Sequence, residues 1–211
     1  MTKEQTLITL VITTIVNVFL TIYLSKKKNK NQLNQVFICA LSLLILWSIG
    51  LIAQIILSQP LKIEPIYFDY FVYIGACFVP VAVFFMGIIY ANTKIEFKKR
   101  YLLLFIVPII SLITLWTNDY HHLFYRQYST NISDTVYGPY IVIHNIYSYI
   151  LLVFGIIYML KFSIKNSGFF SRQSMLIVLG VSVPVVVNIL GTFKIIPMSI
   201  YVTPITFTIT I

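Results

Sequence analysis

The residue best suited to chemistry in this 211-residue sequence is Asp69, a carboxylate at the start of a long apolar segment. An ionisable side chain in a membrane-spanning segment is costly near the bilayer centre and therefore marks a functional candidate. Tyr73 follows four residues later, and Ala76 and Pro80 continue the helical spacing, so all four share one face. Because Asp69 falls within the first turn, we expect it near the outer interface, in reach of water. There it is either a ligand-binding acid or an acid that complements the helix dipole.

Further polar residues recur at helical spacing inside the apolar segments. His144 shares a face with Tyr147, and a histidine there is either a hydrogen-bonded contact between helices or a ligand- or pH-sensing group. Stripes of small and polar residues favour close helix packing in lipid, and the alternative is a polar cavity in the outer half of the bundle. Such stripes are Thr9-Thr13-Asn17-Thr21, Trp47-Gly50-Gln54 and Gly180-Pro184-Asn188-Gly191. The candidate ligand-binding residues are Asp69, Tyr73, His144, Tyr147 and Asn188.

A polar segment between two apolar ones holds the other two histidines. It contains Asn118, Asp119, His121 and His122. Imidazole and carboxylate are common zinc ligands, but this segment would need a further ligand, and the sequence has no second His/Cys pair at a fixed spacing. We therefore expect these four residues either to order an outer loop or to lie at the membrane interface, and we expect no metal site.

The sequence contains no arrangement typical of catalysis. It lacks a Ser-His-Asp order, paired carboxylates, a phosphate-binding glycine loop and an HExxH motif. These 211 residues are therefore predicted to have no catalytic residues and no cofactor.

The elements that position these side chains are long apolar segments. Hydrophobic residues make up 59% of the chain and charged residues 10%, against about 45–50% and about 25% in soluble domains, which excludes a soluble globule and a disordered chain. A helix needs about 20 apolar residues to cross a bilayer. The sequence thus predicts an all-α polytopic membrane helix bundle, a single membrane domain over 1–211. Its predicted spans are 6–24, 36–57, 67–90, 101–117, 140–160 and 174–193, with an incomplete seventh at 204–211.

The basic residues are distributed unevenly between alternate loops. One side has eleven of the fifteen Lys and Arg residues and the other side has four. The positive-inside rule therefore places the N-terminus outside. The net charge of +9 reflects topology and contacts with anionic lipid, and we expect no nucleic-acid partner. The eleven are Lys26, Lys27, Lys28, Lys30, Lys94, Lys98, Lys99, Arg100, Lys161, Lys165 and Arg172; the four are Lys3, Lys62, Arg126 and Lys194.

The segment 115–125, LWTNDYHHLFY, resembles the T-N-x-x-H-H-L-F segment of the seven-helix amino-terminal sensor region of bacterial histidine kinases. The motifs that follow have a similar order. They are Tyr137-Gly138-Pro139, His144 with Tyr147-Ser148-Tyr149, Arg172-Gln173, Pro184 with Asn188, and Thr203-Pro204. One departure is Tyr201, which stands where the family commonly has an acidic residue two positions before the Thr-Pro pair.

The resemblance implies the signal-sensing input domain of a two-component signalling protein. Such a domain relays an extracellular or membrane cue, which is a small molecule, a lipid or a peptide, to a cytoplasmic transmitter domain in cis if the reading frame continues. The resemblance also implies a homodimer. Two alternatives are a small membrane transporter and a non-catalytic membrane subunit that binds partner helices. The sequence shows neither the duplicated halves common in transporters nor an acid or base at a bilayer midplane.

Overall fold

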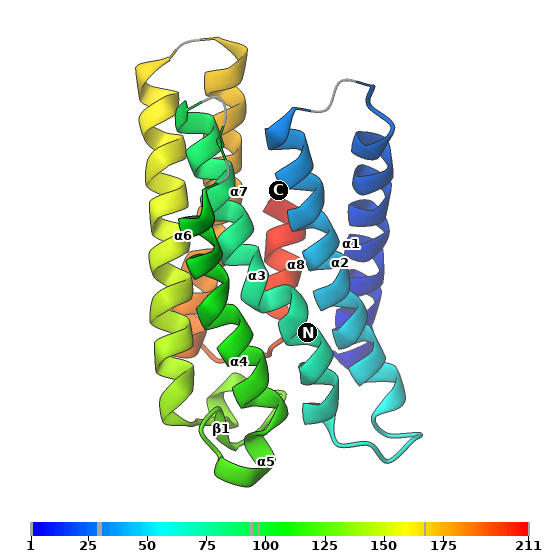
Figure 1. The fold of residues 1–211 in the computed structure, drawn as a ribbon. Helices are drawn as coiled ribbons and strands as arrows, with labels where there is room; N and C mark the ends of the chain where they lie inside the picture. The colour runs from blue at the N-terminus through cyan, green and yellow to red at the C-terminus, as the bar shows by residue number, and fades with distance from the viewer. Residues whose placement is uncertain (1, 29–30, 93–94, 97, 167, 211) are drawn as a thin grey trace.

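The computed structural model describes residues 2–28, 31–92, 95–96, 98–166 and 168–210 of the chain. Helices account for nearly all of the regular structure, and two short strands form one antiparallel pair (Figure 1). The elements in chain order are α1 (Lys3–Ser25), α2 (Gln32–Leu57), α3 (Pro65–Asn92), η1 (Lys99–Phe105), α4 (Ile106–Trp116), α5 (Asn118–His121), β1 (Tyr125–Gln127), η2 (Ile132–Asp134), β2 (Val136–Tyr137), α6 (Pro139–Lys165), α7 (Phe169–Thr192) and α8 (Val202–Thr210).

Six helices in the described part of the chain are long and apolar enough to cross a membrane, and they confirm the six predicted spans. The main differences are at the ends, because α6 continues to Lys165 and α7 already begins at Phe169. The seventh segment is the nine-residue helix α8, which begins at Val202 rather than at Pro204. At about 1.5 Å per residue, nine residues are too short to cross the hydrocarbon core.

The fourth span begins as a 3-10 helix, η1, before it becomes the α-helix α4. Pro108 lies three residues into this α-helix and has no backbone N–H to donate to the carbonyl of Leu104. That carbonyl accepts a hydrogen bond from the Tyr147 hydroxyl of α6 instead. The change in helix type therefore lies close to the proline, and a neighbouring helix satisfies the backbone group that the proline leaves free.

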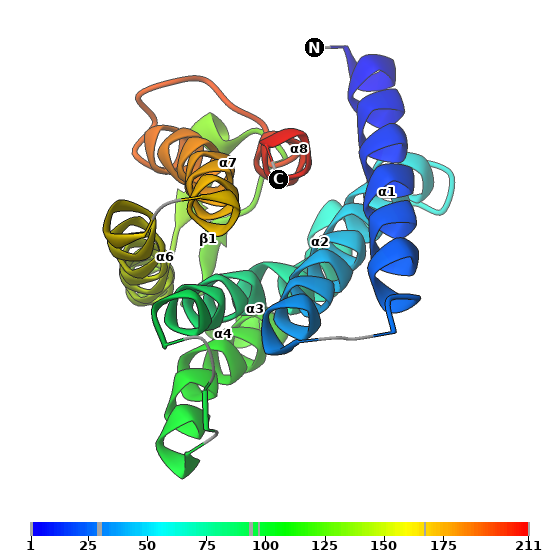
Figure 2. The same cartoon turned by 90° about the horizontal axis from the view of Figure 1, so that it is seen from above.

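Six of the helices form a ring in which each one packs against the next. Its order is α1, α2, α3, α6, α7 and α8, and α8 closes the ring by contacting α1 (Figure 2). The α4 helix lies outside this ring against α3 and α6. The Asn17 side chain of α1 donates a hydrogen bond to Thr208 of α8 at 2.9 Å, so the closure includes a specific polar contact.

Glycines allow α3 to approach its neighbours closely. A Cβ added at Gly87 would lie 2.5 Å from the carbonyl oxygen of Gly155 in α6. A Cβ added at Gly75 would collide with the backbone of Leu43 in α2. Small residues at crossings of this kind replace hydrophobic packing as the source of helix association in lipid.

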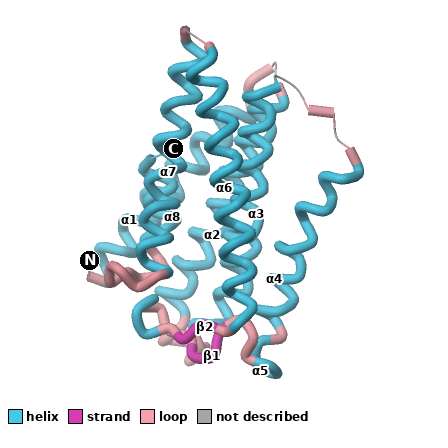
Figure 3. The backbone as a smooth tube through the Cα atoms, turned by 90° about the vertical axis from the view of Figure 1, so that its left-hand side faces the viewer, coloured by secondary structure: helices cyan, strands magenta, loops and turns pink. Residues whose placement is uncertain are grey.

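The connections gather at the two ends of the bundle. One end has α5, the β1–β2 pair, the segment 193–201 that joins α7 to α8, and the α2–α3 connection (Figures 1 and 3). We call residues 117–138 the outer loop and residues 193–201 the strap. The opposite end has the connections rich in lysine and arginine, of which Lys30 and Lys94 lie outside the described residues. Which end faces the cell exterior stays a prediction from charge.

Candidate functional site

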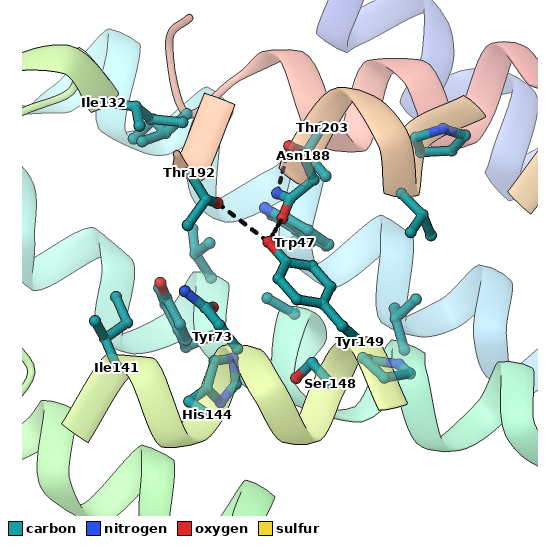
Figure 4. Close-up of a pocket in the computed structure, with 18 of the residues that line it drawn as sticks. Trp47, Tyr73, Ile132, Ile141, His144, Ser148, Tyr149, Asn188, Thr192 and Thr203 are labelled. Atoms are coloured by element: carbon teal, nitrogen blue, oxygen red, sulfur yellow. Dashed lines mark hydrogen bonds between the residues drawn. The ribbon is translucent and has the colours of Figure 1, made fainter. Parts of the chain in front are cut away.

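A cavity of about 140 Å³ lies inside the ring, between α2, α3, α6, α7 and α8 (Figure 4). A cavity of about 150 Å³ in another protein is large enough to bind benzene, so this one has room for a one-ring molecule. Four of the five predicted ligand-binding residues line it, and the fifth, Tyr147, does not. The four are Asp69, Tyr73, His144 and Asn188.

Asp69 is buried, with 2% of its surface exposed, so the expectation that water reaches it is wrong. The helix begins at Pro65, which puts Asp69 in the second turn, and the outer loop covers this part of α3. The Gln54 amide donates a hydrogen bond to the Asp69 carboxylate at 3.3 Å. Tyr128 of the outer loop is hydrogen-bonded to the same carboxylate and accepts a second bond from Gln54 at 2.8 Å.

Tyr73 connects the cavity to the outer loop. Its hydroxyl shares a 2.8 Å hydrogen bond with that of Tyr125 in β1. Its ring meets Phe124 edge to face, with the ring centroids 5.0 Å apart. Burial raises the pKa of the Tyr125 hydroxyl, which therefore stays protonated and can donate to Tyr73. Phe124 is completely buried, so the predicted motif supplies an aromatic anchor for the loop.

His144 faces the cavity and is anchored to α4 on its other side. Its Nδ1 lies 2.9 Å from the hydroxyl oxygen of Ser111, and that hydroxyl donates to the carbonyl of Val107 at 2.8 Å. The single hydroxyl proton of Ser111 is donated to the Val107 carbonyl. The Nδ1–H of His144 is therefore the donor to the Ser111 oxygen, and Nε2 is the nitrogen left as an acceptor. The histidine is therefore both a contact between helices and part of the cavity wall.

Asn188 joins three helices. Its side-chain oxygen accepts a hydrogen bond from Tyr149 of α6 at 2.7 Å, and its amide donates to Thr203 of α8 at 3.0 Å (Figure 4). The hydroxyls of Tyr149 and Thr192 also lie 3.2 Å apart, within hydrogen-bonding distance. The sequence left two roles open for the α7 stripe, helix packing and the lining of a polar cavity. Asn188 has both, because it joins helices and lines the cavity.

Ser148 is a cavity residue that the candidate set from the sequence did not include. Its hydroxyl is buried and has no hydrogen-bond partner among the described residues, and the residue lines the cavity (Figure 4). The position of Ser148 in the sequence, between Tyr147 and Tyr149, could have indicated it as a candidate. Helical geometry turns Tyr147 toward Leu104, outside the ring, while Ser148 and Tyr149 turn inward.

Asn118 of the outer-loop motif is hydrogen-bonded to the backbone of the same loop. Asn118 is buried, and its side-chain oxygen accepts hydrogen bonds from the backbone N–H groups of Phe124 and Tyr125 at 2.9 and 3.0 Å. Its amide returns a bond to the Tyr125 carbonyl at 3.0 Å. This one side chain therefore closes the turn that ends α5.

The rest of the motif lies at the surface. His121 accepts a hydrogen bond from the backbone N–H of Leu123 at 3.0 Å and contacts the Thr117 hydroxyl at 2.9 Å. His122 ends α5 in the left-handed conformation, and Asp119 is exposed. Within the described residues, no three His, Cys, Asp or Glu side chains gather where a metal ion could be held.

The strap is attached to the outer loop beside the cavity. The backbone N–H of Ile132 donates to Met198 at 2.9 Å, and that of Ile200 donates to Thr130 at 3.1 Å. The ammonium of Lys194 adds bonds to two loop carbonyls, at 3.0 and 2.9 Å. Ile132 and Ile200 both line the cavity, so loop and strap form part of its wall.

Tyr201 stands at the end of the strap, at the position where the resemblance implies an acidic residue. Burial and the charge of Asp69 raise its pKa to about 12. An acidic residue here would place a second carboxylate where it interacts with Asp69. The departure from the family pattern therefore changes the charge next to the cavity.

The comparison with protein families decides the identity. The family model described as the N-terminal 7TM region of histidine kinase matches residues 9–211. The chain belongs to this family. Neither a curated protein nor a solved structure matches the chain significantly. This sensor region is an integral membrane protein, and the family is the sensory part of histidine kinases rather than their catalytic part.

Proposed function

We propose that the cavity of this sensor region is its input site, and that its occupancy changes the packing of α8. The observation that carries this proposal is that α8 forms part of the cavity wall, through Thr203 and Phe207. A molecule in the cavity would contact α7 and α8 together. It would therefore act on the helix that leads toward the C-terminal side of the region, where the family has its transmitter.

The coupling acts as a shift between two packing states. Asn188 and the strap hold α8 against α7 and the outer loop, and Asn17 holds it against α1. A ligand shifts the populations only by the difference between its affinities for the two states, so it must fit one arrangement of α8 better than the other. The cytoplasmic transmitter domain in cis and a second copy of the chain are the partners in this proposal.

The orientation is part of the proposal. The excess of Lys and Arg at the end opposite the outer loop supports an N-terminus and an outer loop on the outside of a bacterial cytoplasmic membrane. Tyr120 is 89% exposed in the outer loop, and Lys27 lies at the basic end. We expect a membrane-impermeant maleimide to label Tyr120→Cys in intact cells, and Lys27→Cys only after permeabilisation, both in a Cys39→Ser background. The reverse pattern would invert the topology.

The proposal is tested by filling the cavity in the natural full-length protein in nanodiscs. Ser148→Leu places a larger apolar side chain in the cavity, and Ser148→Ala removes the hydroxyl without adding volume. We expect Ser148→Leu to change basal autophosphorylation at least threefold. The matched control Ile150→Leu, on an exposed face of α6, should leave it unchanged. Equal autophosphorylation by the intact protein, the Ser148→Leu variant and a protein lacking residues 1–200 would remove the input role.

A further inference from the structure

Asp69 differs from every other acidic residue of the chain. The other five acidic side chains are exposed, whereas Asp69 is buried and borders the cavity. Its partners are neutral, since Gln54 and Tyr128 supply one amide and one hydroxyl. Among the described residues, no lysine or arginine acts on this carboxylate.

A buried carboxylate without a cation is an expensive feature. Taking a charge out of water costs several kcal/mol unless the charge is paired, and the membrane interior adds to that cost. The amide of Gln54, at 3.3 Å, is a long hydrogen bond and compensates only partly. A cation in the cavity would therefore be the partner that stabilises this carboxyl group in its charged form.

Aromatic rings surround the same cavity. Tyr73 lies one turn from Asp69 on the same face of α3. Further aromatic rings of the lining are those of Trp47, Tyr125, Tyr137, Tyr149 and Phe207. The face of an aromatic ring attracts a cation within about 6 Å, most strongly where water is excluded. A carboxylate beside several aromatic rings matches the chemistry that recognises an organic ammonium ion.

We propose that the cavity binds a small organic ammonium ion, with its nitrogen at the Asp69 carboxylate and its apolar body against the aromatic lining. This inference rests on the proposed function, because it names the chemical class of the input ligand. The cavity volume of about 140 Å³ limits the body to about one ring. Ser148, with its unpartnered hydroxyl, provides a second polar contact for a ligand that reaches α6.

An inorganic cation fits the lining less well. Sodium- or calcium-like ions need about six oxygen ligands, and the wall near Asp69 offers mainly aromatic and aliphatic groups. Gln54, which is hydrogen-bonded to Asp69, has an unpartnered side-chain oxygen, but it does not itself line the cavity. The aromatic lining therefore favours an organic cation.

Three matched probes test the charge requirement on the full chain in nanodiscs, with binding followed by calorimetric titration and thermal shift. They are 2-phenylethylammonium, the neutral 2-phenylethanol and the anionic 3-phenylpropionate. We expect the ammonium to bind at least tenfold more tightly than the alcohol, and the carboxylate not to bind. Asp69→Asn, which keeps the shape, should abolish the ammonium preference without loss of alcohol binding. The exposed control Asp119→Asn should retain the preference.

Several outcomes would overturn the inference. They are equal or tighter binding of the alcohol by the natural chain, an unchanged preference in Asp69→Asn, and saturable stabilisation by sodium chloride but not by the ammonium probe. If Asp69→Asn does not fold, the ranking of the three probes on the natural chain decides. The proposed function fails separately. Alcohol binding without ammonium preference leaves the cavity as an input site, whereas autophosphorylation that Ser148→Leu leaves unchanged removes that role.

Discussion

The amide of Asn188 donates a hydrogen bond to the hydroxyl of Thr203 at 3.0 Å, and this contact links α7 to α8 across the cavity wall. The same asparagine accepts from Tyr149, so α6, α7 and α8 meet at one side chain. An arrangement of this kind can register a ligand in the cavity as a change in the position of α8. A substitution of Asn188 should therefore test whether signalling can be changed while the bundle stays folded.

Replacing Asn188 with leucine should weaken the attachment of α8 to α7 without unfolding the bundle. Hydrogen bonds between membrane helices contribute about 0.6 kcal/mol each, with a maximum of about 1.7, so the loss of two predicts about 1–3 kcal/mol. We expect a lower thermal unfolding temperature and at least a twofold change in basal autophosphorylation of the full-length protein. Ser42→Ala serves as the control, because its hydroxyl bonds only within α2. Identical behaviour of both variants would contradict the role of Asn188.

Substituting Gly87 with alanine should separate α3 from α6. The new Cβ would lie 2.5 Å from the Gly155 carbonyl oxygen and 2.8 Å from its Cα, which are backbone atoms that cannot move aside alone. Overpacking of this kind costs about 1–3 kcal/mol, and thermal unfolding in nanodiscs measures it. In Gly191→Ala the added methyl meets only the flexible Met198 side chain, so we expect a smaller effect. A larger loss in Gly191→Ala than in Gly87→Ala would refute this account.

Replacing Asn118 with alanine should open the turn after α5. It leaves the N–H groups of Phe124 and Tyr125 without their acceptor, and each unsatisfied buried group costs about 1–3 kcal/mol. Asn118→Asp keeps the acceptor for both N–H groups, but it places a charged oxygen where the amide donated to the Tyr125 carbonyl. We therefore expect its loop to be protected more than that of Asn118→Ala and less than that of the natural chain. Limited proteolysis of the outer loop gives the order, with the exposed Asp119→Asn as control. Protection of Asn118→Ala equal to that of the natural loop would show that the motif does not order it.

Much of the fold could be predicted from the sequence because the relevant signals are local. Membrane spans follow from runs of about 20 apolar residues, and the six predicted spans match the structure to within a few residues at most ends. The exceptions are few. The fourth span starts as a 3-10 helix, and α6 and α7 extend beyond the apolar runs into the basic connection between them.

The candidate site was predicted less completely because it depends on contacts between distant segments. Helical spacing placed Asp69 and Tyr73 on one face, which the cavity confirms. It did not predict that residues 124–128 would cover Asp69, since that contact joins residues far apart in the chain. Tyr147 and His144 are three residues apart and can share a face. The Tyr147 hydroxyl, however, donates to the backbone carbonyl of Leu104, outside the ring of helices.

The last prediction concerns Lys194, whose ammonium bonds to the carbonyls of Ser133 and Thr135 in the outer loop. Lys194→Met removes both bonds and keeps a side chain of similar length. The backbone bonds between Ile132 and Met198 and between Ile200 and Thr130 remain, so we expect local opening rather than unfolding. Hydrogen exchange should become about fivefold faster at Ile132 and Ile200 and stay unchanged in α3.

The functional consequence of that opening separates two roles for the strap. If the strap transmits occupancy of the cavity to α8, Lys194→Met should reduce the autophosphorylation response to a cavity ligand while leaving ligand binding nearly intact. If the strap only closes the cavity, binding itself should weaken in proportion to the opening. Lys62→Met, at an exposed site in the α2–α3 connection, is the matched control for loss of one positive charge at this end. Ile200 lines the cavity and lies two residues before the start of α8. We therefore expect a reduced autophosphorylation response with ligand binding nearly intact.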